Sequence, residues 1–192
     1  MIKLLRFSDY EKKLWKNGRG TTVEIALCPA GGEFDWRLSM ADLNESGPFS
    51  FFPGMERILV LLEGAAIKIT HQAEASEKNL PLLEPYRFCG EWKTEAIVKE
   101  QGRDFNLIYR RDKFVGEVLV ESYTQPHQRM IEDKGVSAIF CLEGKILTEL
   151  GELRRYDTLL VDHQAVRIET SGQTRLINVQ LRSIHHTTPR EF

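Results

Sequence analysis

The chain carries the stretch Arg57-Ile58-Leu59-Val60-Leu61-Leu62-Glu63-Gly64 and echoes it as Val136-Ser137-Ala138-Ile139-Phe140-Cys141-Leu142-Glu143-Gly144. Each copy is an apolar strand that ends in Leu-Glu-Gly and is followed by a second strand. The two glycines lie 80 positions apart in a chain of 192 residues. Because glycine readily adopts backbone angles that other residues resist, we interpret each copy as a β-hairpin. The repeat therefore predicts two similar β-barrels in tandem.

Short strands between turn signals continue on both sides of the repeat, which predicts an all-β fold. In the first half we expect strands at residues 22–27, 36–41, 57–62, 66–71, 96–99 and 105–109. In the second half we expect them at residues 116–122, 137–142, 145–150, 158–161, 166–169 and 176–181. Helical periodicity is scarce. The capping-box spacing of Ser8 and Glu11 predicts one or two helical turns at residues 11–15.

Charged residues interrupt the strands at residues 111–115, where we place the seam between the barrels. We expect residues 1–112 to form a first barrel that carries the pocket, and residues 113–192 to form a second barrel within the same compact unit. The second half has no comparable set of arginines, and Asn178 and Gln180 are its notable amides. We therefore interpret it as a packing or dimerisation partner.

The composition is that of a soluble globular protein, with 42% hydrophobic and 28% charged residues. A net charge of -2 gives no electrostatic reason to expect nucleic acid or an anionic membrane as a partner. No apolar run approaches the length of a membrane span, and the start of the chain lacks a signal-peptide core. The three cysteines are widely spaced and are expected to be buried, reduced thiols. These features predict a cytoplasmic protein.

The stretch between residues 14 and 26 is unusually varied in chemical type and is interpreted as the rim of a small-molecule pocket. It combines an aromatic ring, cations, an amide, glycines, hydroxyls and a carboxylate, from Trp15, Lys16, Asn17, Gly18, Arg19, Gly20, Thr22 and Glu24. A phosphate-binding P-loop is excluded because a β-branched strand, not a helix, follows the glycines. Backbone N–H groups around the two glycines could still form an anion-binding concavity, helped by Lys16 and Arg19.

Alternate residues of a strand face opposite ways, which separates polar from apolar faces in the first half. Trp36, Leu38 and Met40 oppose Arg37 and Ser39. By the same rule, Thr22 and Glu24 share one polar face, as do Asn106 and Arg110. These faces either meet water or converge on a ligand. Their Arg, Asn, Thr and Ser content favours convergence, because arginine forks bind carboxylates and amides fix orientation.

The apolar, turn-rich segment at residues 47–54 has two readings that the sequence leaves open. It is either a plug at one end of the barrel or an aromatic wall of the pocket.

The pattern points away from metal and cofactor chemistry. The five histidines form neither H-x-H nor H-x-x-x-H, so we expect neither a metal nor another cofactor. Glu24, Asp42 and Asp104 could act as acids or bases in a pocket, but no nucleophile is paired with them. A carboxylate near arginines is more commonly part of a structural salt bridge.

Five motifs occur in order: Trp15-Lys16-Asn17-Gly18-x-Gly20-Thr21-Thr22-x-Glu24-Ile25-Ala26, Phe34-x-Trp36-Arg37-Leu38-Ser39-x-Ala41, Gly47-Pro48-Phe49-Ser50-x-Phe52-Pro53-Gly54-x-x-Arg57, Leu62-Glu63-Gly64 and Arg103-Asp104-Phe105-Asn106-Leu107. This series closely resembles the HutD/Ves family of bacterial proteins, densely at residues 14–110 and more loosely beyond. The resemblance implies a bicupin, two RmlC-like jelly-roll barrels in one chain. Cupin enzymes usually hold a metal with an H-x-H…E…H set, which this chain lacks. Arg19 departs from the family, which often has glycine there.

The resemblance also implies a function. HutD-type proteins are associated with histidine-utilisation gene clusters and are thought to bind formiminoglutamate or formylglutamate, whereas Ves-type members are linked to cold and stress responses. No enzymatic activity is established for the family. The primary hypothesis is therefore a small-molecule-binding modulator of histidine utilisation.

The expected ligand-binding residues are Trp15, Lys16, Asn17, Gly18, Gly20, Thr22, Glu24, Trp36, Arg37, Arg57, Asn106 and Arg110. In this hypothesis the three arginines anchor carboxylates, Asn17, Thr22, Glu24 and Asn106 orient a formyl or formimino group, and Trp15 or Trp36 covers it. The expected partner is a small carboxylate, with a homodimer as one arrangement. One alternative is a metal-free cupin isomerase or hydrolase that uses Glu24 or Asp104 as general base. Another is a stress-response interaction protein for which the barrel is a scaffold.

Overall fold

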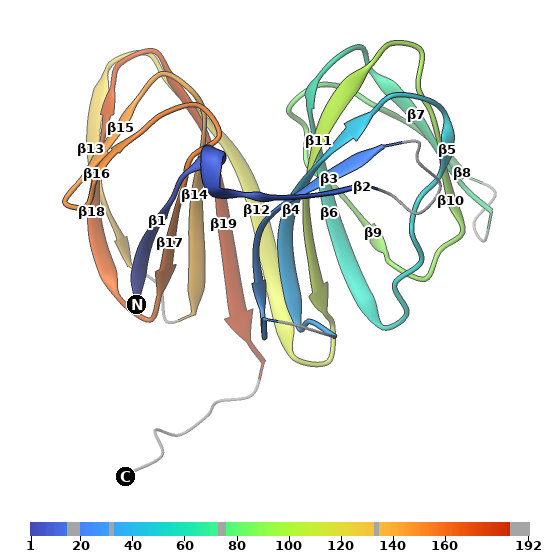
Figure 1. The fold of residues 1–192 in the computed structure, drawn as a ribbon, viewed down its shortest axis with the longest axis horizontal. Coiled ribbons are helices and arrows are strands. Elements are labelled where there is room, and N and C mark those ends of the chain that lie inside the picture. The colour runs from blue at the N-terminus through green and yellow to red at the C-terminus, as the bar shows by residue number, and fades with distance from the viewer. Residues whose placement is uncertain (15–19, 31–32, 73–75, 133–134, 185–192) are drawn as a thin grey trace, which may run out of the picture.

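The computed structural model describes residues 1–14, 20–30, 33–72, 76–132 and 135–184, which form two β-lobes side by side (Figure 1). In the first lobe the large sheet has the order β2 (Glu11–Leu14), β3 (Thr21–Cys28), β4 (Trp36–Leu43), β11 (Gly102–Arg110), β6 (Met55–Glu63) and β9 (Tyr86–Cys89). A four-stranded sheet faces it, with the order β5 (Gly47–Pro48), β10 (Thr94–Ile97), β7 (Ile67–His71) and β8 (Ser76–Leu80).

The second lobe repeats this plan. Its five-stranded sheet has the order β1 (Ile2–Leu5), β17 (Thr158–Asp162), β14 (Val136–Glu143), β19 (Thr174–Ser183) and β12 (Phe114–Tyr123). Its four-stranded sheet has the order β13 (Pro126–Glu132), β18 (Ala165–Ser171), β15 (Ile146–Thr148) and β16 (Gly151–Leu153). All twelve strands predicted from the sequence are present, and the prediction of an all-β chain is confirmed.

The helical turns predicted at residues 11–15 are wrong. A 3-10 helix covers Phe7–Asp9, and Glu11–Leu14 forms β2, which pairs antiparallel with β3. The local capping signal at Ser8 is outweighed because β3 offers this segment a complete ladder of backbone hydrogen bonds.

The repeated Leu-Glu-Gly is not a hairpin turn, which corrects the sequence interpretation. β6 belongs to the six-stranded sheet and β7 to the four-stranded one, so Gly64 is a corner between two sheets. The same holds for Gly144, between β14 and β15. Both glycines have positive φ, 95° and 76°. Both glycines therefore adopt the positive backbone angles that the sequence predicts. These angles lead the chain from one sheet to the next and do not form a hairpin turn.

The equivalence of the two copies extends to their neighbours. Leu59 in the first copy pairs with Asn106 of β11, and Ile139 in the second pairs with Asn178 of β19. The register also shifts near the end of both copies, between Arg103 and Asp104 in one lobe and between Cys141 and Glu143 in the other.

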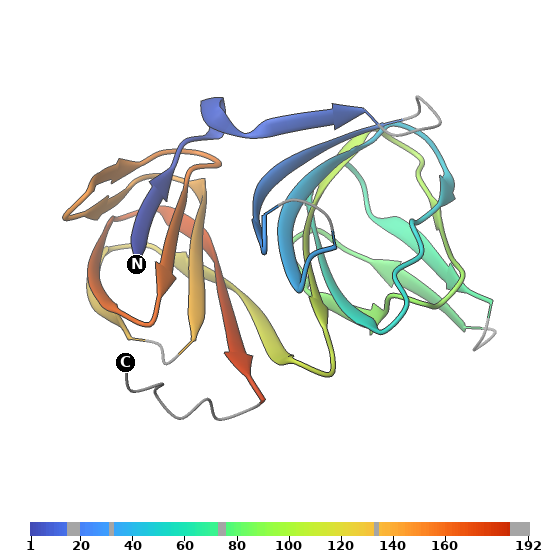
Figure 2. The same cartoon turned by 60° about the horizontal axis from the view of Figure 1, so that its bottom comes forward.

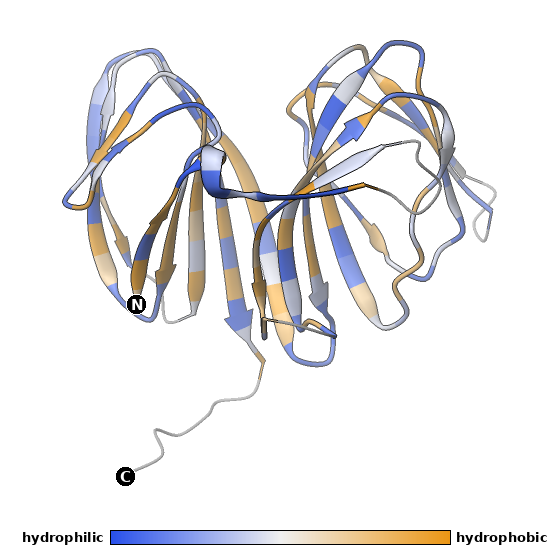
Figure 3. Cartoon of the chain, in the orientation of Figure 1, coloured by the Kyte–Doolittle hydropathy of each residue, from blue (hydrophilic) through white to orange (hydrophobic). Residues whose placement is uncertain are grey.

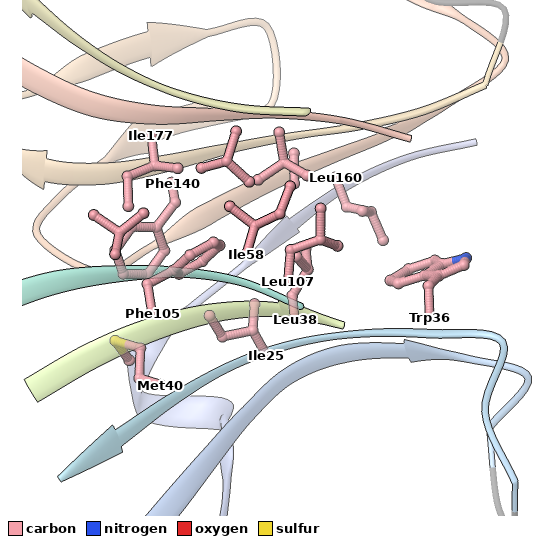
Figure 4. Packing of buried hydrophobic residues seen from close by; sticks show 14 of the residues in the cluster. Ile25, Trp36, Leu38, Met40, Ile58, Phe105, Leu107, Phe140, Leu160 and Ile177 are labelled. Carbon is pink, nitrogen blue, oxygen red and sulfur yellow. The ribbon is translucent and has the colours of Figure 1, made fainter. Parts of the chain in front are cut away.

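The largest apolar core lies between the lobes. Its buried side chains come from the two large sheets and point toward one another in Figure 4, among them Phe105, Leu107, Phe140 and Ile177. Each lobe has a smaller core between its own two sheets. Apolar and polar residues alternate along the strands, as Figure 3 shows, so each large sheet can bury one face against the other lobe.

The N-terminal segment joins the lobes. β1 pairs with β17 of the second lobe and β2 with β3 of the first, and Figure 2 shows the segment crossing between them. The chain crosses between the lobes again from β11 to β12. The division into residues 1–112 and 113–192 stays a prediction, although strand pairing carries β1 across it. In the described residues, no helix is long and apolar enough to span a membrane.

Candidate functional site

The candidate site is built on the three central strands of the six-stranded sheet, β4, β11 and β6. Ile108 of β11 pairs with Arg37 on one side and with Arg57 on the other. Because alternate residues share a face, the next inward positions of β11 are Asn106 and Asp104. These polar side chains face the inside of the first lobe, whereas Phe105, Leu107 and Tyr109 face the second lobe.

This inner face borders a cavity of about 580 Å³. Its walls come from β2 (Lys13, Leu14), β3 (Thr22, Glu24), β4 (Arg37, Ser39, Ala41, Leu43), β5 and the loop after it (Pro48, Phe49, Ser50, Phe52), β6 (Arg57) and β11 (Asp104, Asn106). The segment at residues 47–54 therefore forms an aromatic wall, which decides between its two readings. The polar faces converge on one space.

Two guanidinium groups project into this region with unsatisfied hydrogen-bonding capacity. The Nε atoms of Arg37 and Arg57 are buried and have no partner among the described residues. Both guanidinium carbons lie over the Phe52 ring, at 5.3 Å for Arg37 and 5.8 Å for Arg57. Burial lowers the pKa of both groups, that of Arg57 to about 10. A buried guanidinium with a free N–H favours an anionic acceptor.

A short hydrogen-bond chain links Arg57 to a buried carboxyl group. Arg57 Nη2 donates to Asn106 Oδ1 at 2.7 Å, and Asn106 Nδ2 donates to Asp104 Oδ1 at 2.7 Å. Asp104 is 1% exposed. Burial raises the pKa of Asp104 to about 7, against the lowering effects of Arg57, the Ala41 backbone and Asn106. This carboxyl group therefore changes charge near neutral pH.

An ion pair closes the rim. Lys13 Nζ lies 3.2 Å from Glu24 Oε1, and the Glu24 side chain is 15% exposed. The pair neutralises itself, so the interior charges of Arg37, Arg57 and Asp104 dominate the cavity.

The structure brings five of the predicted ligand-binding residues to this cavity, namely Thr22, Glu24, Arg37, Arg57 and Asn106. Gly20 is buried just before β3 but does not line the cavity. Trp15, Lys16, Asn17 and Gly18, together with Arg19, lie outside the described residues.

Two predicted placements are corrected. Trp36 is buried between the lobes, as Figure 4 shows, because it lies on the opposite face of β4 from Arg37. It cannot cover a ligand in the cavity. Arg110 lies at the exposed end of β11 and holds Asp112, with Nη2–Oδ2 at 2.6 Å. It borders a separate surface hollow of about 960 Å³ beside Phe34.

Sequence reasoning missed some of the lining. The local sequence predicts a helical turn at Lys13. Its place on β2 depends on the pairing of β2 with β3. Phe49 and Phe52 belong to the segment for which the sequence allows either a plug or an aromatic wall. No local signal in the sequence favours the wall. Asp104 was considered as an acid or base, and strand alternation with Asn106 was the signal that could have placed it here.

The residues present do not fit a metal ion of the kind that cupins hold. Among the described residues, no three His, Cys, Asp or Glu side chains gather as ligands. The cavity instead holds two guanidinium groups, which repel a cation.

Comparison with known proteins assigns the family. The sequence profile of HutD matches residues 7–178. The chain belongs to the HutD family. A Pseudomonas putida protein described as lying in the hutC 3' region is 39% identical over 116 residues, 59% of this chain and 60% of that protein. Protein Ves from Escherichia fergusonii is 35% identical over 140 residues, 70% of this chain and 73% of Ves. The matched segment spans only 60% of the P. putida protein and 59% of Ves from Citrobacter koseri.

Solved structures of HutD relatives share the fold. A conserved protein of unknown function from Pseudomonas aeruginosa PAO1 superposes with a TM-score of 0.85 at 28% identity, covering 95% of this chain and 100% of that one. HutD from Pseudomonas fluorescens SBW25 gives 0.79 at 29% identity, with the same coverage. A cupin 2 conserved barrel protein from Leptotrichia buccalis gives 0.59 at 9% identity over 85% of this chain and 89% of its own. The likeness at 9% identity extends to fold alone, and the predicted cupin-like class is confirmed.

Proposed function

We propose that this HutD-family protein binds a small carboxylate metabolite in the first-lobe cavity and modulates histidine utilisation through it. The proposal is carried by the guanidinium groups of Arg37 and Arg57, whose buried Nε atoms lack partners in the described part of the chain. A carboxylate satisfies such forks bidentately. The pathway is supported by the P. putida relative, which lies in the hutC 3' region.

Formiminoglutamate and formylglutamate are the candidate ligands. Each carries carboxylates for the two arginines. Asn106 offers an amide and Thr22 a hydroxyl beside them, and a cationic formimino group suits Glu24 at the rim. Phe49 and Phe52 provide an apolar wall, which is the usual composition of a small-molecule site.

The test is a thermal-shift and calorimetric titration with formiminoglutamate, formylglutamate, glutamate and urocanate at millimolar concentration. A ligand that binds the folded state at 100 times its Kd stabilises the protein by about 2.7 kcal/mol and raises Tm by several degrees. If none of the four raises Tm, the histidine-pathway ligand is wrong.

Matched arginine variants localise the binding. Arg37→Met and Arg57→Met keep side-chain volume but remove the forks, so each is expected to weaken binding at least tenfold, about 1.4 kcal/mol or more. Arg110→Met is the control, because Arg110 holds Asp112 outside the cavity. Equal losses in all three variants would contradict the site.

A second function, catalysis by a metal-free cupin enzyme, is favoured by one observation. The pKa of Asp104 is raised to about 7 by burial, which suits a general acid or base. In that case a candidate ligand turns over, and Asp104→Asn abolishes turnover while binding persists. Binding without turnover in the wild-type protein supports the ligand-binding function.

The stress-response interaction role follows only from the resemblance to Ves-type proteins, and protein Ves from Escherichia fergusonii is 35% identical over 140 residues. It predicts that cavity variants such as Arg57→Met leave the cellular phenotype intact. Loss of the phenotype in that variant, with Arg110→Met unaffected, would exclude a pure scaffold.

A further inference from the structure

The first-lobe cavity holds two interior cations whose separation is set by the sheet. Arg37 and Arg57 flank the same residue, Ile108, across β11. Neighbouring strands lie about 4.8 Å apart, so the two backbones are roughly 10 Å apart, with both side chains on one face. Both guanidinium groups also lie over the Phe52 ring, so one aromatic side chain contacts the two cations. This arrangement matches a short ligand with an acidic group at each end.

Among the described residues that line the cavity, Asp104 is the fully buried carboxyl group beside these cations. Asp104 is buried and reaches Arg57 only through Asn106, without a direct ion pair. Its carboxyl group therefore leaves the arginine forks open to the cavity. With Asp104 ionised, the set of Arg37, Arg57 and Asp104 carries one net positive charge. With Asp104 protonated, it carries two.

Other charged groups around Asp104 are already paired. On the neighbouring strand β4, Asp42 lies 2.7 Å from Arg103. From β3, Glu24 faces the cavity but is held by Lys13 of β2, whose Nζ also lies 3.3 Å from Glu11 Oε2 on the exposed strand β2. These pairs add little net charge at the bottom of the cavity. The balance there is set by Arg37, Arg57 and Asp104.

We propose that the protonation state of Asp104 decides the charge of the ligand that the cavity accepts. This inference rests on the proposed carboxylate-binding function. A dianionic dicarboxylate neutralises the interior only when Asp104 carries a proton, so it binds with uptake of one proton from solvent onto the Asp104 carboxylate. A monoanion of the same shape neutralises the interior with Asp104 ionised and needs no added proton. Asp104 is thus a specificity-determining residue.

The titration of Asp104 is poised for this role. Its pKa is about 7 because burial outweighs the lowering effect of Arg57. A second carboxylate placed on the arginines offsets their positive charge, so it raises the pKa of Asp104 further. Linkage then makes the dianion bind more tightly below the pKa of the free protein than above it.

The experiment compares glutarate with glutaramate, in which one carboxylate is replaced by a neutral amide. Isothermal titration near pH 6.5 and near pH 8, in two buffers of different ionisation enthalpy, yields both Kd and the number of protons taken up. Glutarate is expected to bind about tenfold more weakly near pH 8, with uptake approaching one proton there. Glutaramate is expected to change less than about threefold over this range, with little uptake.

Two variants assign the proton. Asp104→Asn fixes a neutral group in place, so glutarate binding becomes independent of pH and proton uptake disappears. Asp112→Asn is the matched control, because Asp112 pairs with Arg110 outside the cavity, and it keeps the wild-type pH dependence. Should Asp104→Asn fail to fold, the carboxyl ¹³C resonance of Asp104 in the wild-type protein provides the second readout. Glutarate is expected to raise its titration midpoint, and glutaramate to leave it nearly unchanged.

The outcomes separate the two ideas. Binding of glutarate without proton uptake, or with equal uptake in Asp104→Asn, overturns the role of Asp104 and leaves carboxylate binding intact. Failure of every carboxylate to bind at either pH overturns the proposed function and this inference with it.

Discussion

Single residues in the first-lobe cavity are placed there at a cost in stability. Arg57 is 5% exposed and Asp104 1% exposed, yet they are joined only through the amide of Asn106. Buried charges without direct partners destabilise a fold. Their presence on the central strands is explained by a ligand that completes the hydrogen bonds, and less well by structural stabilisation.

Asp104→Asn is expected to change how stability depends on pH. The folded-state pKa of Asp104 is about 7, above the usual value of 3.8. Between these values the folded state holds a proton that the unfolded state has released, so this group makes the protein less stable as pH rises from about 4 to about 7. The variant removes that loss, and its stability relative to wild type should grow by about 3–4 kcal/mol over this range.

Urea unfolding at a series of pH values measures this difference. Asp112→Asn serves as the control, since Asp112 is paired with Arg110 and exposed. A constant difference between Asp104→Asn and wild type from acid to neutral pH would contradict the raised pKa.

At the scale of elements, corners and a connecting segment place the strands. Gly64 and Gly144 turn the chain from the large sheet of each lobe into its four-stranded sheet. The N-terminal segment adds β1 to one lobe and β2 to the other. β2 pairs with β3 and brings Lys13 to the rim, so the N-terminal segment contributes to the cavity wall.

Glycine substitutions test the corners. A Cβ on Gly64 would lie 2.7 Å from the Gln101 carbonyl oxygen, at φ 95°, so Gly64→Ala should destabilise the protein by about 2–4 kcal/mol. Gly54→Ala combines φ 73° with open space and should cost about 1 kcal/mol. Gly47→Ala, with no atom within 4 Å, is the control and should change stability by less than about 0.5 kcal/mol. Chemical denaturation gives the three values, and the absence of this order would contradict the corner geometry.

The hydroxyl group of Tyr10 tests the connecting segment. It donates to the Tyr156 carbonyl at 2.8 Å and bonds Thr158 Oγ1 at 2.7 Å, both in the second lobe. Tyr10→Phe leaves these buried groups without a partner, so unfolding free energy should fall by about 1–2 kcal/mol. Ser8→Ala, whose exposed hydroxyl bonds Asp9, is the comparison. Equal stability of both variants would show that the segment does not tie the lobes.

The whole molecule is held by a core shared between the lobes. Phe105 of the first lobe and Phe140 of the second are both fully buried, with ring centroids 5.1 Å apart. Because the main apolar cluster draws on both large sheets, neither lobe buries its sheet face alone. The polar part of the first lobe's inner face, which holds Arg37, Arg57 and Asn106, thereby borders the cavity.

The shared core predicts that the lobes unfold together. Calorimetry should show one transition, with the calorimetric and van't Hoff enthalpies equal. Phe105→Ala should lower the unfolding free energy by about 3–5 kcal/mol without splitting that transition. Val115→Ala is the control, because Val115 is 61% exposed. Two resolved transitions in the wild-type protein would contradict a common core.

The sequence alone determined where twelve of the strands lie and which of their side chains share a face. Both properties depend on local periodicity, so Arg37, Asn106, Thr22 and Glu24 could be separated from the apolar face that holds Phe105. The five ordered motifs indicated the family, and through the family resemblance they indicated the cupin-like class.

Only the tertiary structure decided what each face meets. The apolar face bearing Trp36 packs against the other lobe and the polar face borders the cavity, because two large sheets bury their apolar sides against each other. Arg110 shares the alternation of Asn106 but lies beyond the cavity, at the end of its strand. Long-range pairing likewise made residues 11–14 a strand and Gly64 a corner. Local sequence cannot encode these outcomes because each depends on which distant segment lies alongside.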